Sequence, residues 1–516
     1  MSLLSLGYIL FIIVFLILFY TIKQKQWIVL LIASCIFYAS FDIRAFVFIL
    51  LSITTTYFAA IKIDSKNEQV KLIEDKTDRK SIKKITKHQN NHIVLFVLII
   101  NFAILFGLKY ISYLLQYTSK LHDYSLFNRF FIPLGISFYT FQAMGYLMDV
   151  NNKQAKVENN FFKFALFISF FPQIIQGPIS TFNDLQPELT RKHTFNYDNV
   201  VYGIWRIIYG LLKKFFIADS LVSIVNQVFD HSSLQNASVN LIGILAYAFY
   251  QYCDFSGGID MIIGTARLFD IKMIENFKRP YFSVSLTDFW HRWHISLGNW
   301  MRKYVFYPFA LTKMMLNFGK WTSKHVGKFA GRVMPAAIAN LLVFALIGVW
   351  HGFELHFLLW GLYNGLVIAI ASFMEPVFNK MRHITHFNLE KPGWHVFAVI
   401  RTFIVVNIGW IFDRANTGSD IHTIFASFFS HYKLTTSFIP SMQIGAMQKI
   451  TILGSILLLF ILFIISLLQE KRVPLFTHLL KCPMAIRCLL VIILFVGVIV
   501  VTIINGSTGG FMYARF

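Results

Sequence analysis

Charged residues are scarce in this chain of 516 amino acids. Only 14% of the residues are charged, whereas 56% are hydrophobic and 17% aromatic, and the mean hydropathy is +0.59. A soluble protein of this length needs far more polar surface than this composition supplies. The scarcity of charge excludes a soluble enzyme and predicts an all-α, polytopic integral membrane protein.

Cysteine is also rare, and several catalytic motifs are missing. The four cysteines form no Cys-x-x-Cys pair, which argues against a disulfide or zinc framework. The sequence has no Gly-rich phosphate loop ending in Gly-Lys-Ser/Thr, no Gly-x-Ser-x-Gly elbow and no His-Glu-x-x-His run. We therefore expect no ATP-driven pump, no serine nucleophile, no metal site and no bound cofactor. The cysteines are Cys35, Cys253, Cys482 and Cys488.

Long hydrophobic runs dominate what is present. The first has no basic segment before it and no small-residue cleavage site after it, so we expect a retained membrane helix rather than a signal peptide. Several later runs are too short or too interrupted to be plain spanning helices. Together they predict 11 to 13 membrane elements, at residues 3–20, 27–41, 45–61, 93–117, 131–149, 161–178, 201–229, 238–269, 335–350, 355–376, 396–412, 448–469 and 485–505.

Two of these runs contain helix-breaking residues. Pro133 and Gly135 open one run, and Pro172, Gly177 and Pro178 interrupt another. Non-helical backbone at membrane depth is tolerated only where protein buries it or where it lines a cavity. The sequence therefore predicts broken or re-entrant helices around a water-accessible space.

Basic residues outnumber acidic ones, 47 to 25, which gives a formal charge of +22. They lie between hydrophobic runs rather than on a water-soluble fold, so we expect a lipid bilayer and no nucleic acid as partner. Residues 62–92 and 313–332 are the two main basic segments, and both are predicted to be cytoplasmic loops near anionic headgroups. This orientation places the N-terminus outside.

Two histidines lie where an ionisable side chain is unfavourable unless it faces a cavity or a partner. His351 follows a hydrophobic run, and His294 lies in residues 281–309, which are too polar to span and predict an amphipathic or re-entrant helix. A neutral imidazole in a cavity can take a proton from a hydroxyl group. The alternatives are a packing histidine for His351 and an interfacial one for His294. Asp254 fits an ion path, an organising hydrogen bond or a helix-breaking loop with a capping aspartate.

Eight short motifs follow one another at residues 133–142, 170–178, 210–219, 252–257, 275–277, 288–300, 350–352 and 409–415. With these motifs the sequence resembles the membrane-bound O-acyltransferase family, and within it the bacterial alginate O-acetyltransferase-like branch. The family fold is a ring of helices around a central funnel through the membrane. The resemblance implies N-terminal membrane helices with the basic loop 62–92 (1–129), a catalytic core (130–415) and C-terminal membrane helices (416–516).

The resemblance also implies roles for particular residues. The histidine of the family's Trp-His-Gly motif is its presumed catalytic residue and corresponds to His351, while His294 corresponds to the second polar residue of the site. We expect His351 to act as general base and His294 to orient the acceptor or stabilise developing charge. Neighbouring residues are then expected to contact substrate, namely Trp350, Gly352, Trp293, Ser296, Asp288 and Arg292.

The implied reaction moves an acyl group, usually acetyl, from a cytosolic thioester across the membrane to a hydroxyl. The expected donor is acetyl-CoA or an acyl carrier protein. The expected acceptor is a cell-envelope or secreted polysaccharide, reached through a separate extracytoplasmic esterase-like acyltransferase. The expected location is the bacterial cytoplasmic membrane.

Two alternative functions stay open. The segment after the histidine block departs from the alginate-type pattern at Arg302 and Pro308 and continues into a basic insertion, which favours the related D-alanyl transferase of teichoic-acid modification. His291 and Asp413 are further departures. A transporter or channel would use His294, His351 and Asp254 as a path, but it predicts inverted repeats, which we do not find in the sequence.

Overall fold

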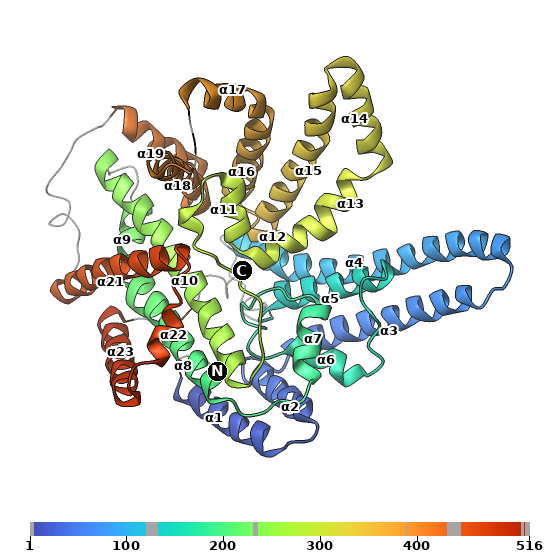
Figure 1. Ribbon diagram of the computed structural model, residues 1–516, viewed down its shortest axis with the longest axis horizontal. Coiled ribbons are helices and arrows are strands. Elements are labelled where there is room, and N and C mark those ends of the chain that lie inside the picture. The colour runs from blue at the N-terminus through green and yellow to red at the C-terminus, as the bar shows by residue number, and fades with distance from the viewer. Residues whose placement is uncertain are drawn as a thin grey trace. The chain divides into compact units, whose positions relative to one another are not determined.

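The computed structural model describes residues 5–119, 133–230, 236–386, 388, 390–430, 445–506 and 510, and in this part of the chain the regular structure is helical, without strands (Figure 1). Two short apolar helices, α1 (Leu6–Thr21) and α2 (Gln26–Ala39), come first. Among the described residues, seven helices are long and apolar enough to cross a membrane, so the prediction of an all-α, multi-pass membrane protein is confirmed. They are α3 (Ala45–Lys71), α4 (Lys76–Ser119), α15 (Lys328–His351), α16 (Leu355–Phe373), α18 (Pro392–Arg414), α21 (Ala446–Glu470) and α23 (Met484–Asn505).

The chain divides into two compact units. The first comprises Met1–Ile207, Ile262–Ile274 and Tyr513–Arg515, and the second comprises Ile208–Met261, Glu275–Met512 and Phe516. Of the boundaries predicted from sequence, the one between residues 129 and 130 lies outside the described residues. The one between 415 and 416 falls within the second unit, so the division into three parts stays a prediction.

The predicted helix breaks are confirmed in the first unit. Gly135 adopts a positive φ of 70° before α5 (Ile136–Asn151), and α6 (Phe161–Ser169) ends before the proline-containing stretch. Buried side chains satisfy the broken backbone, since Ser34 Oγ accepts the N–H of Phe171 at 3.1 Å. Gln142 Nε2 donates to the carbonyl of Phe167 at 2.8 Å. The breaks are therefore buried within protein, and the predicted funnel stays a prediction. The unit continues with α7 (Phe182–Thr190) and most of α8 (Tyr197–Leu211).

Both predictions of basic loops were wrong about the backbone. The segment 62–92 continues α3 to Lys71 and resumes as α4 at Lys76, leaving only a short turn between them. The segment 313–332 forms α14 (Lys313–His325) and the start of α15 (Figure 1). Lysine, arginine, glutamate and glutamine are good helix formers, so their polarity indicates contact with water rather than a loop.

The second unit contains the candidate site. Helices α15 and α16 pack closely here, because Gly348 and Gly361 leave room for the partner helix: a Cβ on Gly348 would lie 2.5 Å from the carbonyl oxygen of Phe357. The remaining elements are η2 (Leu212–Ala218, a π-helix), α9 (Asp219–Phe229), α10 (Ala237–Leu268), η4 (Pro280–Phe282), α11 (Leu286–Arg292), α12 (Ile295–Met301), η5 (Arg302–Phe306), α13 (Tyr307–Ala310), α17 (Glu375–Thr385), α19 (Gly418–Ser430) and α22 (Leu475–Leu480).

Candidate functional site

His351 is the last residue of α15. Gly352 follows it in extended conformation and ends the helix. The imidazole is buried, with its ring centroid 4.9 Å from that of Trp360 on α16 and 5.0 Å from that of Trp350. Backbone atoms of α16 fill the space beside the flanking Gly348, where a Cβ would lie. This glycine therefore serves helix packing rather than the approach of a ligand.

His294 lies at a break between two short helices. Helix α11 starts at a serine cap, where Ser285 Oγ accepts the N–H of Asp288 at 3.1 Å, and it ends at Arg292. His294 then adopts a left-handed conformation with φ of 44°, and α12 begins at the next residue. The prediction of an amphipathic or re-entrant helix through residues 281–309 was wrong about a shared helical face, because a left-handed residue interrupts the 3.6-residue period on which such a face depends. Whether the segment is re-entrant stays a prediction.

Asn276 holds this break in place. Its side-chain Oδ1 accepts the N–H of Ser296 at 2.9 Å and lies 3.4 Å from Nδ1 of His294. Its carbonyl oxygen accepts the N–H of Ile295 at 3.0 Å. The Asn276 side chain is fully buried. One residue therefore fixes both the backbone around His294 and one edge of its ring.

The environment of His294 keeps its imidazole neutral. Burial lowers the pKa of His294 to about 3, because a charged ring would be far from water. Its ring meets that of Phe255 edge-on at 4.8 Å. Within the described residues, Asn276 Nδ2 and Ser296 Oγ are buried without a hydrogen-bond partner. Such atoms mark a place where a water or a ligand group is expected.

A continuous series of aromatic rings links the two histidines. Trp360 stacks on Trp410 at 6.4 Å, and Trp410 lies 5.2 Å from Trp293. From Trp293 the series continues through Phe277, at 5.1 Å, to Phe255, at 5.0 Å from Phe277. Trp293 and Trp410 are both almost completely buried. The structure thus brings His351, His294, Trp350 and Trp293 into one aromatic cluster.

Asp288 and Arg292 form an ion-pair network. Arg292 Nε lies 2.9 Å from Asp288 Oδ1, and its Nη1 lies 3.1 Å from Glu470 Oε1 on α21. Asp288 Oδ2 also accepts the N–H of Val284 at 3.1 Å. Arg279 contacts the same glutamate. These contacts stabilise the α11 segment, and a contact of either side chain with substrate stays a prediction.

Two buried lysines on the π-helix η2 face carboxylates of α9 and α10. Lys214 Nζ lies 2.5 Å from Asp254 and 2.8 Å from Asp219, and Lys213 pairs with Asp260. Asp254 lies in the middle of α10, so the alternative of a helix cap was wrong. The network locks the helix carrying Phe255 to η2.

Sequence reasoning missed three contributors to the cluster. Asn276 and Trp410 lie inside motifs at residues 275–277 and 409–415, and that position was the available signal. Trp360 gave no signal in the sequence, because it is one tryptophan within a hydrophobic run. Within the described residues, no group of three or more His, Cys, Asp or Glu is placed to hold a metal ion.

The sequence matches a known protein family and named relatives. The family described as MBOAT, membrane-bound O-acyltransferase, matches residues 93–410, a span that contains both histidines. The chain is 30% identical over 412 residues to a protein of Pseudomonas syringae pv. tomato named probable alginate O-acetylase AlgI, covering 78% of this chain and 70% of that protein.

Two further relatives carry different names. The peptidoglycan O-acetyltransferase of Helicobacter pylori is 29% identical over 422 residues, covering 76% of this chain and 71% of that protein. The teichoic acid D-alanyltransferase of Bacillus subtilis is 31% identical over 288 residues, covering 54% of this chain and 67% of that protein.

Proposed function

This chain belongs to the membrane-bound O-acyltransferase family, and from that premise we propose that it transfers an acetyl group from acetyl-CoA to a hydroxyl for the O-acetylation of a cell-envelope or secreted polysaccharide. The family makes it an O-acyltransferase, and its apolar helices make it a multi-pass membrane protein. We assign it to the bacterial cytoplasmic membrane.

The observation that carries the proposal is the buried aromatic cluster that contains both histidines of the family site. A shielded imidazole stays neutral and able to accept a proton, and water is excluded from a thioester that it would otherwise hydrolyse. Two of the relatives, named for alginate and for peptidoglycan, support acetyl as the acyl group and a polysaccharide as the acceptor.

The proposed step uses His351 as general base. The acceptor O–H bond breaks as its proton moves to the imidazole, and a new C–O bond forms to the acyl carbon. The C–S bond then breaks, and the leaving thiolate takes the proton from His351, which regenerates the neutral ring. His294 and its partner Asn276 orient the reacting groups, with Ser296 Oγ as a further donor beside them.

In this proposal, a separate extracytoplasmic esterase-like protein carries the acetyl group to the polymer. The described chain consists of helices and their connections, and the acceptor hydroxyl of the first transfer belongs either to that partner or to the polymer itself.

A D-alanyl transfer from a carrier-protein thioester to teichoic acid is the second candidate. The match to the Bacillus subtilis D-alanyltransferase favours it, although that match covers only 54% of this chain. The chemistry at His351 would be the same, so the two candidates differ in donor and acceptor alone.

The test compares base-labile acetyl and D-alanyl esters on the host envelope. Wild-type protein, His351→Ala and His294→Ala are compared with the exposed control His395→Ala. We expect both site variants to lose acetyl esters while the control keeps them. Loss of D-alanyl esters instead selects the second candidate, and unchanged esters in all variants reject acyl transfer.

A further inference from the structure

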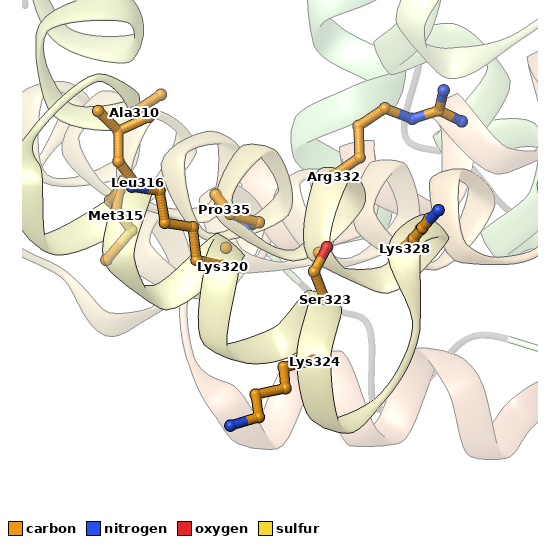
Figure 2. Close-up of a pocket in the computed structure, with 11 residues that line it drawn as sticks. Ala310, Met315, Leu316, Lys320, Ser323, Lys324, Lys328, Arg332 and Pro335 are labelled. Atoms are coloured by element: carbon orange, nitrogen blue, oxygen red, sulfur yellow. The ribbon is translucent and has the colours of Figure 1, made fainter.

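A basic pocket lies between α14 and α15, in the second unit. It has a volume of about 860 Å³ and opens to the surface. Its polar lining consists of four cationic side chains and one hydroxyl, which are Lys320, Lys324, Lys328, Arg332 and Ser323. Figure 2 shows the Ser323 hydroxyl, the Lys328 ammonium and the Arg332 guanidinium directed to the same side, while Lys324 points the other way.

The pocket owes its form to a close helix crossing. A Cβ on Gly319 of α14 would lie 2.9 Å from the carbonyl oxygen of Gly331 of α15, and one on Gly331 would lie 2.7 Å from that of Gly319. Thr312 caps the start of α14 with its hydroxyl, which accepts the N–H of Met315 at 3.3 Å. The crossing therefore holds the two helix backbones that carry the cations close together.

The hairpin that α14 and α15 form carries positive charge without acidic residues nearby in the sequence. Between Asp288 and Glu354 the chain contains no aspartate or glutamate but eight lysines and arginines. The four pocket cations are exposed. A cluster of this kind attracts an anion, and Arg presents the donor fork that suits phosphate oxygens.

The surroundings of the pocket select the kind of anion. Large apolar side chains are exposed around the same hairpin, including Met314, Trp321 and Val326. Trp321 stacks on His325 at 4.8 Å, and tryptophan is typical of the headgroup level of a bilayer. The pocket also lies away from the chemistry, because Arg332 and His351 are about 28 Å apart along α15 at 1.5 Å per residue.

We propose that the α14–α15 pocket binds the phosphate of an anionic phospholipid headgroup, with Lys328, Arg332 and Ser323 as its ligands. The apolar side chains of α14 then lie among the acyl chains, and the hairpin rests at the membrane surface. This site goes beyond acyl transfer and uses none of the residues assigned to it.

The test measures lipid selectivity of the purified full-length protein. Protein in detergent is mixed with equal amounts of phosphatidylglycerol and phosphatidylcholine, and the retained lipid is extracted and quantified. The variant Lys328→Gln/Arg332→Gln removes two pocket charges. Lys380→Gln/Arg382→Gln removes the same charges from the exposed face of α17 and serves as the matched control. Elution profile and melting temperature verify that each variant is folded.

We expect the wild type and the control to prefer phosphatidylglycerol and the pocket variant to lose that preference, by about fivefold for each charge removed. Lys328→Arg/Arg332→Lys, which keeps both charges, is expected to retain it. Equal selectivity of the pocket variant and the wild type, or no preference in the wild type, would overturn the proposal. Inorganic phosphate and coenzyme A are added as competitors in a second arm. If either displaces the lipid through Lys328 and Arg332, the pocket takes a soluble phosphate and the lipid assignment fails.

Discussion

Asn276 Oδ1 lies 3.4 Å from Nδ1 of His294 and simultaneously accepts the N–H of Ser296. The two residues are 18 positions apart, and the asparagine supports both the left-handed backbone and the ring of the histidine. A carbonyl oxygen at this position accepts a hydrogen bond from Nδ1–H, which leaves Nε2 as the acceptor nitrogen of a neutral ring. Asn276 is therefore a positioning residue for His294.

Replacing Asn276 should impair turnover more than substrate binding. We expect Asn276→Ala to lower kcat by about 10- to 100-fold with a smaller change in KM, by analogy with the partners that orient metal-ligating histidines. Steady-state acyl transfer by purified protein measures both constants. Asn388→Ala, at an exposed position, is the control. An equal fall in kcat for both variants would contradict the assignment.

The pH dependence of the reaction should not reflect protonation of His294. Its pKa is lowered to about 3, so the ring stays neutral throughout the accessible range and begins to protonate only near that value. We expect His294→Gln to lower kcat while leaving the acidic limb of the kcat/KM profile in place. If that limb shifts by more than about half a pH unit, His294 is itself the titrating group.

A methyl group at Gly348 should disturb the contact between α15 and α16. A Cβ there lies 2.5 Å from the carbonyl oxygen of Phe357, too close for any real contact. We expect Gly348→Ala to lower the free energy of unfolding by about 1–3 kcal/mol. Gly497→Ala is the matched control, because its Cβ would meet no atom within 4 Å. Melting temperatures in detergent compare the two, and equal values would contradict the close crossing.

Removing the buried cation of Lys214 should lower the stability of the protein more than removing an exposed cation. Lys214→Met leaves the carboxylates of Asp254 and Asp219 buried without that cation, a change that destabilises proteins by about 3–5 kcal/mol. Lys471→Met removes an exposed cation and should have little effect. Yield after extraction and melting temperature measure the difference. Adding Asp254→Asn to Lys214→Met should recover part of the loss.

Features set by local chemistry were predictable from the sequence. Hydrophobic runs identified the membrane helices, and Pro133, Gly135 and Pro172 marked real breaks, because these residues restrict the backbone wherever they occur. The residues of the two histidine motifs could be named from the sequence because each motif is short and contiguous, and their roles stay predictions.

Features set by distant contacts were not predictable. The left-handed turn at His294 depends on hydrogen bonds that Asn276 accepts from the N–H groups of Ile295 and Ser296, and a histidine alone gives no signal of positive φ. Glu470 reaches Arg292 across 178 positions. The charged segment 62–92 is helical because helix propensity follows side-chain shape rather than polarity, which a reading of charge alone overlooks.

Helix α15 carries the basic pocket at its beginning and His351 at its end. Each residue of an α-helix advances the chain by 1.5 Å and turns it by about 100°. A single inserted or deleted residue between Arg332 and His351 would rotate the imidazole away from Trp360. Related sequences should therefore differ in the length of this stretch only by about seven or eleven residues, the steps that nearly restore the original phase.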